Sequence, residues 1–112
     1  MAKAQKSSDT CPMSLGINVL SGKWKLQILS LIHAKKVVRF NELKRNLGCI
    51  TTKTLTDQLR ELEAQGVVQR VVYAQVPPKV EYSLSPIGAQ LEKVLKELCE
   101  WGKEYQKTLE GG

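Results

Sequence analysis

The chain has 112 residues, which is enough for one domain with a hydrophobic core and too few for two. It carries 17 Lys and Arg residues against 11 Asp and Glu residues, and its net charge of +6 is concentrated in residues 20–81, where eleven basic residues stand with five acidic ones. This uneven basic charge favours a polyanionic partner, nucleic acid first, and no apolar run approaches the length that a membrane-spanning helix needs.

The N-terminal third predicts an arm followed by two helices. Residues 1–10 are polar and show no periodicity, so we expect a flexible arm. A short helix is expected over residues 12–20, because proline suits its first position. Ser21-Gly22 interrupts it, and a second helix is expected over residues 23–33. The apolar stripes are expected to be Met13, Ile17 and Leu20 in the first helix, and Trp24, Ile28 and Leu31 in the second.

The middle of the chain predicts a short strand and a pair of helices. Residues 37–39 are expected to form the strand and residues 40–47 a small helix that ends at Gly48. Thr51 is a favourable N-cap for the next helix, which Gly66 ends. Its apolar residues recur at helical spacing and so line one face. They are Leu55, Leu59 and Leu62.

The remaining residues predict a β-hairpin and a long helix. Residues 67–74 and 79–84 are rich in β-branched residues or alternate in polarity, and the prolines between them cannot continue a ladder. The hairpin is therefore expected to have an irregular, basic tip. Ser85 and Pro86 are suited to the cap and first position of a helix expected over residues 86–109, with a narrow apolar stripe.

Two short helices joined by a tight glycine-containing turn, with a hairpin after them, predict a winged helix-turn-helix. The expected fold is mainly α with a small β-hairpin wing, and residues 11–112 form a single domain. A narrow apolar seam on a long helix usually faces another helix, so the N- and C-terminal helices are expected to build a homodimer. The expected dimer contacts are Met13, Ile17, Leu91, Leu95, Leu98, Trp101 and Tyr105.

Lys53 lies in the first turn of its helix, where a cation opposes the helix dipole. In a winged helix-turn-helix this turn meets the base edges in the major groove of DNA, so the lysine favours the complex with double-stranded DNA. Asp57 is expected to orient Lys53 or Arg60 at helical spacing. The expected base or groove contacts are Thr52, Lys53, Thr56, Arg60 and Lys79. The expected backbone contacts, which carry no sequence information, are Lys23, Lys25 and Arg39.

The order and spacing of several motifs resemble the HxlR family of bacterial transcription regulators, relatives of the MarR group. The motifs are Cys11-Pro12, Gly22-Lys23-Trp24, Phe40-Asn41-Glu42-Leu43, Leu55, Leu59-Arg60-Glu61-Leu62-Glu63, Gly66, Arg70, Pro78, Val80-Glu81-Tyr82-Ser83-Leu84 and Gly88. The resemblance implies a dimeric winged-helix protein on a pseudopalindromic operator. It also implies a role for Cys11, since some members sense oxidants or electrophiles through the matching cysteine.

The cysteines are far apart and odd in number. Cys11 precedes Pro12, so its sulfur is expected near a helix N-terminus, where the dipole favours the thiolate. The competing interpretation is an inert thiol at the interface. Cys49 stands where the family usually has glycine, before Ile50-Thr51 in place of isoleucine-serine, and is expected to be a small buried residue. Cys49 and Cys99 are expected to be bystanders, unless Cys49 forms a disulfide with Cys11 of the partner chain.

Other classes of function fit the sequence less well. There is no glycine-rich phosphate loop, nucleophile elbow or pair of carboxylates, so we expect no enzyme. No Cys-x-x-Cys pair occurs and His33 is the only histidine, so no metal and no cofactor are expected. The absence of a hydrophobic leader predicts a cytoplasmic protein with reduced thiols. A winged-helix protein-interaction module without specific DNA readout is the alternative, and RNA suits a groove-filling helix less well than B-DNA.

Overall fold

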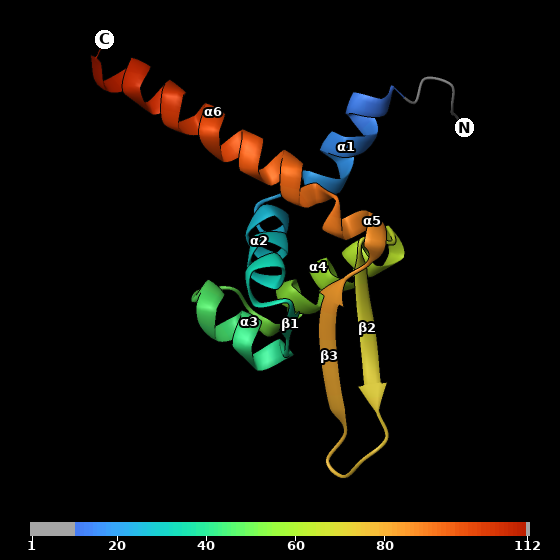
Figure 1. Cartoon of the computed structure of the whole chain (residues 1–112). Coiled ribbons are helices and arrows are strands. Elements are labelled where there is room, and N and C mark those ends of the chain that lie inside the picture. Colours follow the sequence, from blue (N-terminus) through green and yellow to red (C-terminus); the bar gives the residue numbers. More distant parts are fainter. Residues whose placement is uncertain (1–10, 112) are drawn as a thin grey trace.

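The computed structural model describes residues 11–111, so the predicted arm over residues 1–10 lies outside the described residues. The protein is mainly helical with a small antiparallel sheet, as predicted (Figure 1). In chain order the elements are α1 (Pro12–Leu20), α2 (Lys25–Lys35), β1 (Val37–Val38), α3 (Phe40–Leu47), α4 (Thr52–Ala64), β2 (Val68–Tyr73), β3 (Lys79–Leu84), α5 (Pro86–Ala89) and α6 (Leu91–Gly111).

The hydrophobic core lies where α2, α3 and α4 meet the sheet. The predicted face of α4 is confirmed, since Leu55, Leu59 and Leu62 are all buried. The predicted stripe of α2 is wrong in part, because that helix buries the face marked by Ile28 and Ile32. Trp24 and Leu31 are only partly buried. Apolar residues surround much of this helix, so periodicity alone does not select which side faces the core. The core residues are Ile28, Leu29, Ile32, Val38, Leu43, Leu47, Ile50, Leu55, Leu59, Leu62, Val67, Val68 and Tyr82.

The sheet has the strand order β1-β3-β2, with both pairings antiparallel. The predicted short strand is confirmed, and it adds to the predicted hairpin by pairing Val38 with Tyr82 of β3. Within the hairpin the last pair is Tyr73 with Lys79, and the loop between them extends away from the helices as a wing (Figure 1). Tyr82 of β3 is buried, so the central strand anchors the wing to the core.

Local capping follows the prediction. The Thr51 Oγ1 atom accepts a hydrogen bond from the Thr54 backbone N–H at 3.1 Å, which caps α4. The Ser85 Oγ atom accepts one from the Gly88 N–H, also at 3.1 Å, which caps α5. These bonds satisfy amide groups that have no partner inside their own helix. α4 ends before Gly66, whose φ is +82°.

The single helix expected over residues 86–109 is instead two helices, α5 and α6, which are separated at Gln90. α5 is held against the end of α4, because the Ser85 hydroxyl donates to the Gly66 carbonyl oxygen at 2.6 Å and Gly88 packs on the Val67 backbone. Those contacts fix the direction of the first turn. α6 then leaves in another direction and projects far beyond the core (Figure 1).

The close approach at Gly88 makes a stability prediction. A methyl group there would lie 2.1 Å from the Val67 carbonyl oxygen, a backbone atom that cannot move aside freely. We expect Gly88→Ala to lower the free energy of unfolding by about 1–3 kcal/mol, in urea denaturation at a fixed protein concentration. Gly111→Ala is the control, since nothing lies within 4 Å of that position, and it should change the value by less than about 0.5 kcal/mol. Equal stabilities for the two variants would contradict the packing of α5 on Val67.

Candidate nucleic-acid interface

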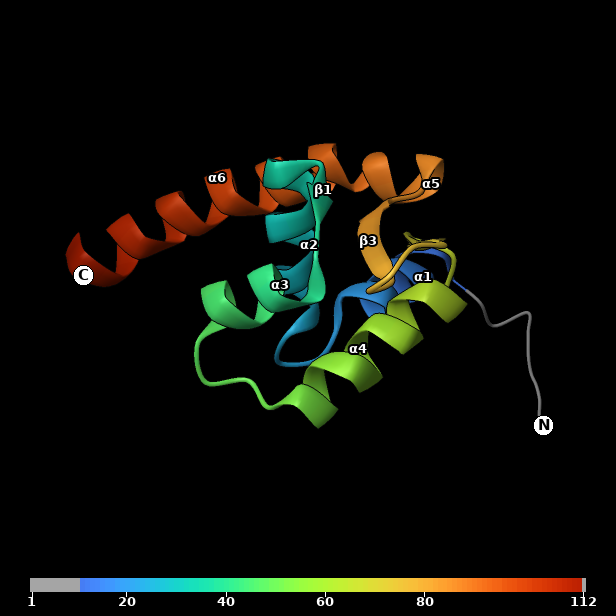
Figure 2. The ribbon, with the colours of Figure 1, turned by 90° about the horizontal axis from the view of Figure 1, so that it is seen from below.

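α4 crosses one face of the protein, and that face is viewed directly in Figure 2. Its leucines are buried in the core, which turns the other side of the helix outward. Of the predicted contact residues, Thr52, Lys53 and Arg60 are exposed and Thr56 is half-exposed. The structure therefore brings Lys53, Thr56 and Arg60 together on the side of α4 away from its leucines, and Thr52 is exposed at the first position of the helix.

Of the two cations on this surface of α4, Lys53 forms an ion pair within the described residues and Arg60 does not. Lys53 Nζ lies 2.9 Å from Asp57 Oδ2, and the lysine side chain is 86% exposed. Asp57 thus pairs with one of the two residues that it is predicted to orient. Arg60 forms no salt bridge with any residue of the described chain. Its guanidinium group, a planar fork with five donors, is available for an external acceptor.

The wing carries its charge at the base of the loop and not at the tip. Lys79 is the first residue of β3, and its Nζ lies 3.3 Å from Glu81 Oε2 and 5.1 Å from the centre of the Tyr73 ring. A hydrogen bond with Glu81, and the charge of that carboxylate, raise the pKa of Tyr73. The predicted basic tip rests on Lys79, which stands where the loop meets β3, and residues 74–78 of the loop itself are uncharged, with Val76 99% exposed.

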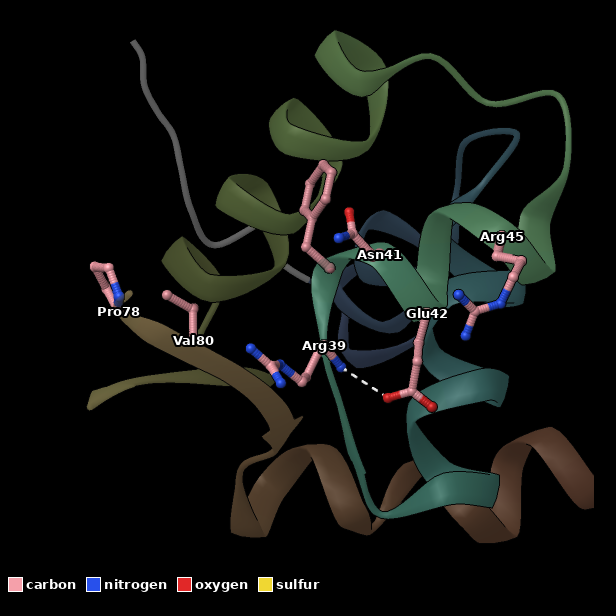
Figure 3. A pocket seen from close by; sticks show the side chains of 7 residues that line it. Arg39, Asn41, Glu42, Arg45, Pro78 and Val80 are labelled. Atoms are coloured by element: carbon pink, nitrogen blue, oxygen red, sulfur yellow. Dashed lines mark hydrogen bonds between the residues drawn. The ribbon is translucent and has the colours of Figure 1, made fainter. Parts of the chain in front are cut away.

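A cleft of about 380 Å³ opens between α3 and the wing (Figure 3). Arg39 and Arg45 bring two positive charges to it, and neither forms a salt bridge within the described chain. Glu42 is directed to the start of α3, where its Oε1 accepts a hydrogen bond from the Arg39 backbone N–H at 3.2 Å. The residues that line the cleft are Arg39, Phe40, Asn41, Glu42, Arg45, Pro78 and Val80.

Arg45 and Asn41 were not among the predicted contacts. They stand at i and i+4 on α3, outside the face that Leu43 and Leu47 bury, and both are exposed. That spacing is visible in the sequence and places the two side chains together on one helix. They face Pro78 across the cleft because β3 pairs with β1, and a local sequence pattern does not predict that pairing.

One predicted backbone contact is contradicted. Lys25 is only 5% exposed and forms an ion pair with Glu61 of α4, so its ammonium group does not reach a surface where phosphate binds. The first position of α2 faces inward in this packing, and a buried cation requires a partner. Lys23 and Arg39, the other two predicted backbone contacts, are exposed, and the Lys23 ammonium lies 5.1 Å from the centre of the Trp24 ring.

The three cysteines are exposed and free. Cys11 occupies the position before α1, as predicted, and the backbone N–H groups of Ser14 and Met13 at the start of that helix lower the pKa of its thiol. The expectation that Cys49 is buried is wrong. It lies in the exposed turn between α3 and α4, where only the neighbouring Ile50 reaches the core.

α1 and α6 project from the end of the protein opposite the wing and expose apolar side chains (Figure 1). Leu91 and Leu95, two of the predicted dimer contacts, pack partly against the core of their own chain. The exposed stripe of α6 instead begins at Val94, and the rings of Trp101 and Tyr105 stack on it with centroids 5.1 Å apart. The large exposed apolar residues of the two helices are Met13, Leu15, Ile17, Val94, Leu98, Trp101, Tyr105 and Leu109.

None of the helices described in residues 11–111 is both long and apolar enough to cross a membrane.

Comparison with known proteins gives consistent matches. A family model described as HxlR-like helix-turn-helix matches residues 19–110. The HTH-type transcriptional regulator BH0655 of Halalkalibacterium halodurans is 49% identical over 106 residues, which cover 95% of this chain and 93% of that protein. The HTH-type transcriptional regulator YtcD of Bacillus subtilis is 54% identical over 96 residues, covering 85% of this chain and 75% of that protein.

A solved structure extends the similarity to three dimensions. The redox regulator HypR in its reduced form has a TM-score of 0.83 at 44% identity, covering 91% of this chain and all of that one. Its oxidized form has a TM-score of 0.76 at 47% identity, covering 84% and 96%. The family model spans most of the chain, and the relatives are transcriptional regulators and not enzymes. The chain therefore belongs to the HxlR-like helix-turn-helix family of transcriptional regulators.

Proposed function

We propose that the protein is a homodimer that binds a pseudopalindromic operator in double-stranded DNA, and that oxidants or electrophiles change this binding through Cys11. Transcriptional regulators with a helix-turn-helix bind DNA, so the proposal concerns specificity, assembly and control. The observation that carries it is the placement of Lys53, Thr56 and Arg60 on the outer side of α4, with Thr52 exposed at its first position, beside a wing and a cleft lined by arginines.

Within this interface α4 reads the bases. Its first turn would enter the major groove, with Thr52, Lys53 and Thr56 near the base edges. A threonine methyl group contacts thymine, and the free guanidinium of Arg60 can donate two hydrogen bonds to guanine O6 and N7. Lys53, which Asp57 holds, contacts either a base or a phosphate. The sequence information would therefore come from a few residues on one face of α4.

The remaining cations would fix the protein on the duplex. Arg39 and Arg45 line the cleft between α3 and the wing, where the DNA strand whose backbone separates the major groove from the adjacent minor groove would place its phosphates. Lys79 would accompany that strand on the wing, and Lys23 would reach phosphate near the start of α2. Such contacts release counterions and add affinity for any sequence.

Dimerisation would cover the apolar faces of α1 and α6. The Cα radius of gyration is 16.3 Å, against roughly 13 Å for a compact domain of about 100 residues, because α6 extends away from the core. A second copy related by a two-fold axis is the commonest way to cover such a face. It would set the two α4 helices about one DNA turn apart, roughly 34–36 Å.

Redox control would begin at Cys11. Its thiol is exposed and its pKa is lowered by the start of α1, which favours the reactive thiolate. Attack on hydrogen peroxide forms an S–O bond as the O–O bond breaks, and gives a sulfenic acid and hydroxide. The relative named as a redox regulator, HypR, supports this assignment. Because Cys11 precedes a helix of the proposed dimer interface, its modification would change the spacing of the two α4 helices.

The function is tested by selecting genomic fragments that the protein binds, with and without peroxide. We expect the selected fragments to share an inverted repeat whose half-sites lie about one helical turn apart. Fragments without any common sequence would contradict specific readout and would favour a module that binds protein. A common sequence without two-fold symmetry would contradict the dimeric operator.

The role of Cys11 is tested by titrating the selected operator before and after peroxide or quinone treatment. We expect the wild type to lose affinity and Cys11→Ser to keep it, with Cys99→Ser as the control that behaves like the wild type. A non-reducing gel of Cys49→Ser shows whether Cys49 of the partner chain forms a disulfide with Cys11. Equal loss of affinity in the wild type and Cys11→Ser, or no loss in either, would show that Cys11 is not the switch.

A further inference from the structure

Lys25 is a buried charge that the proposed DNA interface does not use. It is 5% exposed and occupies the first position of α2, where the helix dipole disfavours a cation. Its ion-pair partner is Glu61 on α4, whose side chain is 56% exposed. A buried ammonium group without a partner costs free energy, so removing Glu61 alone would destabilise the contact between α2 and α4.

The surroundings of this ion pair include the turn between α1 and α2. The Gln58 Oε1 atom, one turn before Glu61 on α4, is buried and has no hydrogen-bond partner in the described structure. Gly22 lies beside it, since a Cβ atom there would be 3.9 Å from Gln58 Oε1 and 4.0 Å from Lys25 Cδ. With a φ of +115°, that position also favours glycine. We call Gly22, Lys25, Gln58 and Glu61 the α2–α4 joint.

The α2–α4 joint adds a directional contact to the hydrophobic packing of α4. The attraction that buries its leucines has no required direction, and their close packing sets the rotation of the helix about its axis. The ion pair links one atom of α2 to one atom of α4, so it resists the same rotation at a second place. Arg60 is the residue next to Glu61, and Thr56 lies five residues before it, so a rotation of α4 moves the DNA-facing side chains directly.

We propose that Lys25 and Glu61 are positioning residues for DNA readout. Their ion pair sets the orientation of α4 relative to α1 and α2, and hence relative to the α4 of the partner in the dimer. This rests on the proposed function. Glu61 is 56% exposed, so the cost of burying a charge falls on Lys25. Replacing both residues by apolar ones of similar volume removes that cost together with the pairing, so the pair serves orientation more than stability.

The decisive variant is Lys25→Met/Glu61→Leu, which removes one cation and one anion and leaves the net charge unchanged. We expect it to fold, with an unfolding temperature close to that of the wild type. Its affinity for the selected operator should fall by at least about tenfold, the effect of removing one good base interaction. Its affinity for an unrelated duplex of equal length should stay within about twofold, because that binding depends on phosphate contacts.

The control variant is Lys107→Met/Glu104→Leu, which makes the same chemical change at an exposed ion pair of α6, away from its apolar stripe. It should keep both affinities. If circular dichroism shows that the first variant is unfolded, Lys25→Gln/Glu61→Gln, which substitutes a neutral hydrogen bond, goes through the same two titrations. The expected result is again a lower ratio of operator affinity to unrelated-duplex affinity.

The outcomes separate this inference from the proposed function. A folded variant that keeps the operator affinity overturns the inference alone. A variant whose two affinities fall together, in proportion to its loss of folded protein, shows a merely structural ion pair and also overturns it. A wild type that discriminates no selected sequence overturns the proposed function, and the inference with it.

Discussion

Leu98→Asp will convert the protein to monomers and lower its operator affinity by about 10²-fold or more. Leu98 lies in the exposed stripe of α6 between Val94 and Trp101, and a carboxylate there would be buried without a partner if a second helix covered it. A monomer loses the second half-site, and linked binding of two sites typically adds about 10²–10⁴ to the affinity of one. Light scattering measures the assembly, and anisotropy titration of the operator measures the affinity.

The matched control for this variant is Gln106→Asp. Gln106 is also exposed on α6 but lies about 100° from Tyr105 around the helix, outside the stripe. It adds the same negative charge, so any loss of affinity that both variants share is a charge effect on DNA binding. We expect Gln106→Asp to remain dimeric. A wild type that scatters light as a monomer at micromolar concentration would exclude the dimer and with it the two-fold operator.

Arg60→Ala will relax the sequence preference at one position of each half-site by about 1–3 kcal/mol, because it removes a bidentate base contact. Arg45→Ala and Lys79→Ala will instead weaken the operator and an unrelated duplex about equally. Each should also reduce the slope of log K against log salt by about one for each phosphate that the protein no longer neutralises. Titrations of single-base operator variants measure the first effect, and titrations at several salt concentrations measure the second.

The control for the charge change is Lys96→Ala. Lys96 is an exposed cation on α6, a helix that lies at the end of the protein opposite the wing (Figure 1), so its removal should leave the salt slope unchanged. If Arg60→Ala changed no base preference and Arg45→Ala changed no slope, the DNA-binding surface would lie elsewhere on the protein. If only Arg45→Ala failed, the cleft between α3 and the wing would not hold the DNA backbone.

Local features of the fold follow from the sequence, because short-range physics decides them. Thr51 and Ser85 cap the helices as predicted, since a side-chain oxygen reaches an amide only three residues away. The leucines of α4 are buried as their spacing predicts, because polar residues occupy the rest of that helix and leave a single apolar face.

The candidate site was predictable to the same extent and for the same reason. The outward residues of α4 are what remains when its leucines face the core, so Lys53, Thr56 and Arg60 could be named from the helix alone. Thr52 could be named from its place in the first turn of the helix. Arg45 could not be assigned to the same surface, since its place opposite Pro78 depends on the pairing of β1 with β3. The exposure of Cys49 likewise depends on how the turn between α3 and α4 lies over the core.

Lys25 shows where local sequence patterns stop predicting the structure and tertiary packing decides it. The sequence by itself determined the winged helix-turn-helix, its helix caps and the outward face of α4, because capping and periodicity act within a few residues of the chain. Only the tertiary structure decided that Lys25 turns inward to Glu61, that Leu91 and Leu95 pack on their own core, and that the last helix breaks at Gln90. Contacts between elements distant in sequence set the direction in which these side chains face. The free energy of that packing exceeds the small conformational preferences of single residues, which are what a sequence pattern records.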